Sequence, residues 1–302
     1  MSKQRTPYKA LFNLFGAIVA LVSVGFVVLQ LRHHANETNL TALSLQTWLS
    51  IGILAIIYGL SASSLSVAWG FLLKHLQLPM PWHWVVRIYG LSQLAKYLPG
   101  NILQMAGRQA MGQAEGLPAW PLAKSTVLEL ALIALVGGLF SALLLPLISA
   151  DPTTPLLNIL ASLLFSTLMV GFVLIVRQLL SASAAKAVAI YAVFLFLTGV
   201  IFFFTLRLIE AKTPSALLSV IVGAYVIAWL LGLITPGAPA GIGIREVVLY
   251  ALLSTQFDQP TILTAVVLGR IITVSGDFLF FLAALGLSTL PTAPNKVMPH
   301  QP

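Results

Sequence analysis

The chain has 302 residues, of which 59% are apolar and 8% are charged, and its formal net charge is +8. Soluble domains usually carry about 25% charged residues, so this composition excludes an ordinary soluble fold and predicts an all-α polytopic membrane protein. The absence of cysteine excludes disulfides, thiolate catalysis and zinc–thiolate or iron–sulfur sites. The positive charge does not require nucleic acid as a partner, because Lys and Arg collect in the cytoplasmic loops of membrane proteins.

The first apolar run, Leu11–Leu31, follows a basic N-terminus. A secretory signal has an apolar stretch of only about 7–15 residues before a cleavage site. This run is longer and ends at Arg32. It therefore predicts an uncleaved first membrane span.

Seven stretches are apolar and long enough to cross the bilayer as helices, which takes about 20 residues. They are Leu11–Leu31, Leu49–Leu73, Ser125–Ser149, Leu156–Val176, Ala187–Leu206, Ala216–Thr235 and Ile262–Leu290. We expect one transmembrane domain over residues 1–290. The polar, Pro-rich segment 291–302 is expected to be a disordered tail.

A further apolar stretch, Trp84–Gly107, is interrupted by Pro99, Gly100 and Asn101. Proline lacks a backbone N–H and glycine permits a sharp reversal. In hydrocarbon such a break is tolerated only where it is buried in protein or lines a wet cavity. The break therefore favours a re-entrant segment beside a cavity, and the alternative is a simple proline kink.

The second broken stretch, Thr235–Leu253, begins with Pro236-Gly237-Ala238-Pro239-Ala240-Gly241. This composition predicts an extended turn and a short helix that begins near Ile242, with Arg245 and Glu246 in its first turn. Free N–H groups at a helix start, next to an arginine, suit an anionic group such as phosphate. The alternative is a loop that only links two helices.

Two broken segments in one transporter-sized chain indicate a substrate site near the middle of the membrane. The number of helices before each break differs, so the sequence leaves open whether the two halves form an inverted or a parallel repeat.

The distribution of Lys and Arg favours a first broken stretch that enters and leaves the membrane on one side. In that topology nine basic residues are cytoplasmic and three are outside. The bias nearly vanishes if the stretch crosses the membrane. The cytoplasmic set is Lys3, Arg5, Lys9, Lys74, Arg87, Arg108, Lys124, Arg177 and Lys186, and the outer set is Arg32, Arg207 and Lys212. The N-terminus is therefore expected to be cytoplasmic.

Three charged residues, Glu129, Arg270 and Asp277, fall within predicted spans, where a charge is costly and faces the bundle interior or a cavity. Arg270 and Asp277 lie on one face of their helix but are too far apart to pair. We expect Glu246 or Glu129 to pair with Arg270, and Arg245 with Asp277. One alternative is that these charges form purely structural pairs that hold helices together. A separate alternative, for Glu129 alone, is a position near the membrane interface.

Two motifs resemble a known family. Lys96-Tyr97-Leu98-Pro99-Gly100-Asn101 with the later Gly107-Arg108 pair, and the set Pro239, Gly241, Gly243, Arg245 and Glu246, are similar to the transmembrane region of lysylphosphatidylglycerol synthases, the flippase-like domain. The resemblance covers essentially the whole chain. It implies movement of a phospholipid or polyprenyl-linked lipid between leaflets. The soluble aminoacyl-transfer domain of the synthases is not found in this sequence, so synthase activity is not expected.

The predicted substrate site combines the two breaks with the charged residues of the last span. Its members are Lys96, Pro99, Gly100, Asn101, Arg108, Gly241, Gly243, Arg245, Glu246, Arg270 and Asp277. We expect Arg108 and Arg245 to hold the phosphate of a lipid head group, because guanidinium binds phosphate through two parallel hydrogen bonds. Lys96 and Glu246 would assist.

These observations predict a lipid flippase or transporter that is not an enzyme. The expected partners are lipids with an anionic head group or a polyprenyl phosphate, with envelope-biosynthesis enzymes as candidate protein partners and no nucleic acid. No cofactor or metal is expected. The expected location is the cytoplasmic (inner) membrane of a bacterium. The two alternatives are a membrane-embedded lipid-carrier transferase and a non-transporting scaffold of a cell-envelope complex.

Overall fold

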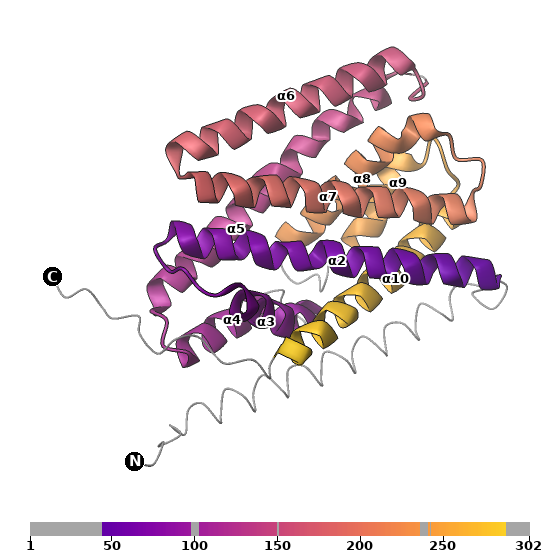
Figure 1. The fold of residues 1–302 in the computed structure, drawn as a ribbon. Coiled ribbons are helices and arrows are strands. Elements are labelled where there is room, and N and C mark those ends of the chain that lie inside the picture. Colours follow the sequence, from indigo (N-terminus) through magenta and orange to yellow (C-terminus); the bar gives the residue numbers. More distant parts are fainter. Residues whose placement is uncertain (1–43, 98–102, 150, 236–240, 242, 288–302) are drawn as a thin grey trace, which may run out of the picture.

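The computed structural model describes residues 44–97, 103–149, 151–235, 241 and 243–287, and every regular element in these ranges is helical (Figure 1). In chain order the helices are α2 (Leu45–His75), α3 (Trp82–Ser92), η2 (Gln93–Tyr97), α4 (Leu103–Ala114), α5 (Ala119–Leu139), η3 (Phe140–Ile148), α6 (Pro155–Leu179), α7 (Ala182–Ile209), η4 (Ser215–Leu217), α8 (Leu218–Ile234), α9 (Ile244–Leu253) and α10 (Gln259–Gly286).

Six helical segments of the described chain are long and apolar enough to cross a membrane. They are Leu45–His75, Ala119–Ile148, Pro155–Leu179, Ala182–Ile209, Ser215–Ile234 and Gln259–Gly286. Each coincides with one of the predicted spans, so the chain is an all-α integral membrane protein. The predicted first span, Leu11–Leu31, and the predicted tail at 291–302 lie outside the described residues.

Polar side chains define where several helices begin. Ser44, Ser181 and Asp258 each accept a hydrogen bond from the backbone N–H three residues later, at the starts of α2, α7 and α10. Such caps satisfy N–H groups that have no partner within the helix. The hydrogen bonds from the Thr261 side chain and backbone hold the pKa of the Asp258 carboxyl below its ordinary value.

The first broken stretch forms a hairpin in which α3 and α4 run antiparallel. The Gln104 amide donates to the Gln93 side chain over 2.8 Å, and Arg108 lies over the ring of Tyr89. Near the start of α3, Trp84 stacks on Trp69 of α2. The hairpin therefore enters and leaves at the C-terminal end of α2, as the predicted re-entrant topology requires. Its turn, with Pro99, Gly100 and Asn101, lies outside the described residues.

The second broken stretch, Thr235–Leu253, contains α9, which folds back along the preceding span α8. This α8–α9 hairpin opens towards the opposite end of the bundle. Leu253 at the end of α9 packs in one apolar cluster with Leu206 near the end of α7 and Leu217 at the start of the α8 segment. In Figure 1, α3 and α4 lie towards the left and α8 and α9 towards the right. The two hairpins therefore open towards opposite ends of the bundle, and they are called inverted in this sense.

Basic residues gather at the end of the bundle where α3 and α4 enter, here called the basic end. The Ser181 hydroxyl lies 2.9 Å from Nδ1 of His75, and Lys186 lies over the ring of Phe71. These contacts place the end of α2 beside the start of α7. The basic residues near this end are Lys74, Arg87, Lys124, Arg177 and Lys186, whereas Arg207 and Lys212 lie near the opposite end.

One described residue of the predicted cytoplasmic set is buried. Arg108 is 2% exposed and lies within α4, where it faces the bundle interior. The reason is the hairpin itself, which folds α4 back against α3 and α5. Arg108 therefore does not contribute to the basic surface at this end of the bundle.

Helices α2 and α10 cross closely at the centre of the bundle. A Cβ atom on Gly276 would lie 2.6 Å from the carbonyl oxygen of Ala55 and 2.8 Å from the backbone nitrogen of Gly59. Small residues allow transmembrane helices to approach in this way. The crossing holds the neighbouring Asp277 inside the bundle, where it is fully buried.

Candidate functional site

A cavity of about 130 Å³ lies inside the bundle, between the two inverted hairpins. Its lining comes from α2, α3, η2, α4, α5, α7, α8, α9 and α10. Most of the wall is apolar, but polar side chains reach it from both hairpins and from four of the spans. These are Tyr58, Tyr89, Gln93, Lys96, Tyr97, Gln104, Arg108, Glu129, Thr198, Tyr225, Arg245, Arg270 and Thr273.

The first of three ion pairs around the cavity joins the first hairpin to α10. Nζ of Lys96 lies 2.6 Å from a carboxylate oxygen of Asp277. The Tyr97 hydroxyl donates to the same oxygen, and the Gln93 amide donates to the other one over 2.9 Å. The predicted partner of Asp277 was Arg245, and this prediction was wrong. The hairpin brings an ammonium group and two neutral donors to the carboxylate instead.

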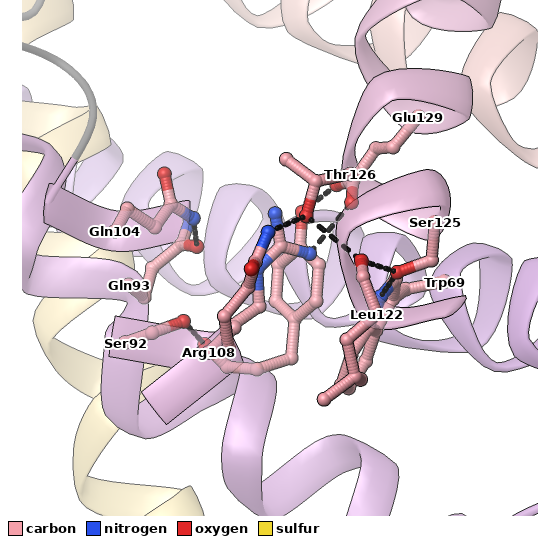
Figure 2. Close-up of polar contacts among 11 residues, drawn as sticks. Trp69, Ser92, Gln93, Gln104, Arg108, Leu122, Ser125, Thr126 and Glu129 are labelled. Carbon is pink, nitrogen blue, oxygen red and sulfur yellow. Dashed lines mark hydrogen bonds and ion pairs between the residues drawn. The ribbon is translucent and has the colours of Figure 1, made fainter. Parts of the chain in front are cut away.

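The second ion pair joins α4 to α5. Nη1 of Arg108 lies 2.6 Å from Glu129, and the Tyr89 hydroxyl donates to the other oxygen of that carboxylate over 2.9 Å. The guanidinium carbon of Arg108 also lies 4.4 Å from the ring centre of Tyr89 and 5.3 Å from that of Trp69. Figure 2 shows Arg108 directed towards Glu129. Glu129 is 6% exposed and therefore faces the bundle interior, as predicted for a charged residue within a span.

The third ion pair joins α9 to α10. Both Nε and Nη2 of Arg270 donate to one oxygen of Glu246, over 3.0 and 2.7 Å. This pairing was predicted from the sequence and is confirmed. The second oxygen of Glu246 is buried without a hydrogen-bond partner.

Arg245 differs from the other cations of the cavity. No described carboxylate lies within ion-pair distance of its guanidinium, and its Nε is buried without a hydrogen-bond partner. Its side chain lies over two glycines that touch each other. A Cβ atom on Gly232 would lie 2.9 Å from the Cα of Gly241 and 3.3 Å from Nε of Arg245. The glycine contact therefore makes room for the arginine beside the cavity.

The helix that carries Arg245 begins where the sequence predicts a short helix. Its first residue is Ile244, and Gly243 immediately before it has a φ of +82°. Gly241 has a φ of +72°. Side chains strongly disfavour this left-handed region, so glycine is required for the turn that aims Arg245 inwards.

The structure brings most of the predicted site residues together. Lys96, Arg108, Arg245 and Arg270 line the cavity, whereas Glu246 and Asp277 reach it through their ion pairs. Sequence reasoning missed the neutral polar lining, above all Tyr58, Tyr225, Gln93 and Gln104, and the close approach of Gly232. Tyrosine hydroxyls and glutamine amides within apolar stretches are the signal that could have identified the lining.

The lining of the cavity combines groups that can bind an anion with apolar surface. Its cations and hydroxyls can donate hydrogen bonds to an anion, and its apolar walls can accommodate hydrocarbon. Among the described residues, no three His, Asp or Glu side chains are close enough to hold a metal ion.

Comparison with protein-family models finds no match for this chain, and comparison with curated proteins finds no significant relative. The resemblance of the two motifs to the flippase-like domain therefore stays a prediction.

Proposed function

We propose that the protein moves an anionic lipid between the leaflets of a bilayer and that Arg245 binds the phosphate of the head group. The observation that carries this proposal is a guanidinium with no described carboxylate partner, facing a cavity inside a transmembrane bundle. The motifs Lys96–Asn101 and Pro239–Glu246, which resemble those of the flippase-like domain, support the same proposal.

The physical reason is the cost of an uncompensated charge at membrane depth. Ionised side chains there are costly unless they pair with another charge or face a polar cavity. The three ion pairs compensate Lys96, Arg108 and Arg270. Arg245 needs an anion from outside the chain, and a phosphate can accept two parallel hydrogen bonds from its guanidinium.

This assignment separates the two arginines of the predicted phosphate clamp. Arg108 already binds Glu129 and stacks on two rings, so we assign it a positioning role between α4 and α5. Lys96 is likewise engaged by Asp277. Arg245 alone keeps the ligand role in the proposal.

The cavity favours a transporter over a lipid-carrier transferase. General acid–base catalysis needs a carboxylate or histidine free to exchange a proton with the substrate. Glu129, Glu246 and Asp277 are each held in an ion pair. We place the protein in the cytoplasmic membrane of a bacterium, with the basic end in the cytoplasm, because basic residues are retained on that side.

The test is lipid movement in vesicles that contain the purified protein. Fluorescent lipid is quenched by a reagent that reaches only the outer leaflet, and the rate of exposure of inner-leaflet lipid is measured. Arg245→Lys should slow movement by a factor of about 10 to 100, because losing a charge-assisted hydrogen bond costs about 1.5–3 kcal/mol.

Arg207→Lys is the matched control, because Arg207 is exposed near the opposite end, away from the cavity lining, and lies over the ring of Phe203. It should move lipid like the parent. An active parent with an unchanged rate for Arg245→Lys, at equal incorporation, would exclude Arg245 as the phosphate ligand. A parent that moves no lipid would favour the scaffold alternative.

A further inference from the structure

The charges that the described residues place around the cavity sum to one positive charge. Lys96, Arg108 and Arg270 are balanced by Asp277, Glu129 and Glu246, and Arg245 is the remaining ion. All six paired groups come from the two hairpins and from α5 and α10. The cavity therefore offers compensation for one negative charge.

We infer that the head group that this cavity accepts is a phosphodiester with a single negative charge and a neutral substituent. This inference rests on the proposed function and narrows its substrate class. A phosphodiester has one ionised oxygen, whereas a phosphomonoester carries a charge of about −1.5 to −2 at pH 7. A diphosphate carries at least as much, and neither would be neutralised by Arg245 alone.

The positive charge of Arg245 also determines which substituents of the phosphodiester are compatible with the cavity. An ammonium group, as in ethanolamine or choline head groups, would restore a net positive charge to a cavity that the phosphate had just neutralised. Neutral groups with hydroxyls do not have this cost. Suitable substituents are therefore a glycerol-like polyol or a sugar.

Two tyrosines provide hydrogen-bonding groups for such a head group. Tyr58 of α2 and Tyr225 of α8 are 5% and 7% exposed, and both line the cavity. No described residue forms a hydrogen bond with either hydroxyl. A phenol can donate to a phosphate oxygen and can donate to or accept from a sugar hydroxyl. The charge of Arg245 and these neutral groups thus face the same space.

Two kinds of lipid share this chemistry, and the experiment separates them. Vesicles at pH 8 are prepared with the parent protein and one fluorescent lipid each. The singly charged lipids are phosphatidylglycerol and a polyprenyl phosphoglucose. The comparison lipids are zwitterionic phosphatidylethanolamine, phosphatidic acid, polyprenyl phosphate and polyprenyl diphosphate.

At least one of the singly charged lipids should move faster than every comparison lipid, by a factor of about 10 to 100, because an uncompensated charge is strongly disfavoured in the membrane interior. Which one moves identifies a glycerophospholipid or a polyprenyl lipid as the source. Equal or faster movement of the doubly charged lipids would overturn this inference and leave the proposed function standing. Movement of no lipid would instead overturn the proposed function, and the inference with it.

A change of charge at Gln104 provides an independent test. This side chain lines the cavity, is half-buried and donates to Gln93. Lysine at this position can still donate to Gln93 and adds a second positive charge. Gln104→Lys should raise the rate for doubly charged lipids relative to singly charged ones by about tenfold or more, and Gln104→Met should not. An unchanged ratio in a folded Gln104→Lys variant would contradict the charge rule.

Discussion

Asp277 has no exposed surface and receives hydrogen bonds from Lys96, Tyr97 and Gln93. It lies beside the close crossing of α2 and α10, where a cation and two neutral donors surround the carboxylate. The same three donors come from one end of the first hairpin, so Asp277 also fixes that hairpin against α10.

Replacing Asp277 should therefore destabilise the protein through the cation that it leaves behind. We expect Asp277→Asn to lower stability by up to about 3–5 kcal/mol, because Lys96, which is half-buried, then remains without a counter-ion. The double variant Lys96→Met/Asp277→Asn removes both charges and should recover part of this loss. The measurement is the thermal unfolding midpoint in detergent, for both single variants, the double variant and the parent.

Equal unfolding midpoints for the parent and Asp277→Asn would show that Lys96 reaches water and that the pair contributes little. Additive effects of the two substitutions would show that the two side chains do not interact energetically.

The pairing of these charges shows what sequence reasoning can and cannot predict about individual residues. The apolar surroundings of Arg270 and Asp277 predict that each needs a partner within the bundle. The Glu246–Arg270 pair could be predicted because Glu246 lies in a short helix next to the last span. The Lys96–Asp277 pair could not, because these residues, about 180 positions apart in sequence, meet only through the folding of the first hairpin.

The two broken helices are the elements that build the cavity. Proline and glycine predict where each helix breaks, and α8 and α9 end and begin close to the predicted positions. The direction from which each hairpin enters is not encoded in the break itself. It follows from the number of spans before each break and from their packing, which the sequence alone leaves ambiguous.

The contact between Gly232 of α8 and Gly241 gives the second hairpin its narrow separation. We expect Gly232→Ala to displace the backbone at Gly241 or the side chain of Arg245, because the added methyl group would lie 2.9 Å from the Cα of Gly241. Lipid movement should fall by about tenfold or more if Arg245 shifts away from the phosphate. The measurement is the vesicle assay, combined with the folded yield.

Gly171→Ala in α6 is the matched control, because a Cβ atom at that position would meet nothing within 4 Å. It removes a glycine from a transmembrane helix without altering the cavity and should leave the rate unchanged. If Gly232→Ala moves lipid as fast as Gly171→Ala, the position of Arg245 does not depend on the glycine contact.

Across the whole molecule, the short helices α4 and α9 are each joined to the following span by an ion pair, and the two pairs have opposite polarity. Arg108 of α4 binds Glu129 of α5 in a buried pair, and Glu246 of α9 binds Arg270 of α10 in a partly buried one. Movement of α4 away from α5 would have to break a buried pair, which is strongly unfavourable. Motion that keeps both pairs intact must move α4 together with α5 and α9 together with α10.

The inverted hairpins lead to a prediction about the topology of the whole molecule. The chain contains no cysteine, so single cysteines can be introduced without background. Gln113 at the end of α4 and Gln178 at the end of α6 are exposed near the basic end, whereas Lys212 and Thr255 are exposed near the opposite end. We expect an impermeant thiol reagent added outside intact cells to label cysteines at Lys212 and Thr255, and to label those at Gln113 and Gln178 only after lysis.

Positive charge near the basic end favours this orientation, because such residues are held in the cytoplasm. The reverse pattern would invert the orientation of these segments. Labelling of Gln113 and Gln178 from different sides would contradict the structure, because two spans, α5 and α6, lie between them and return the chain to the same side.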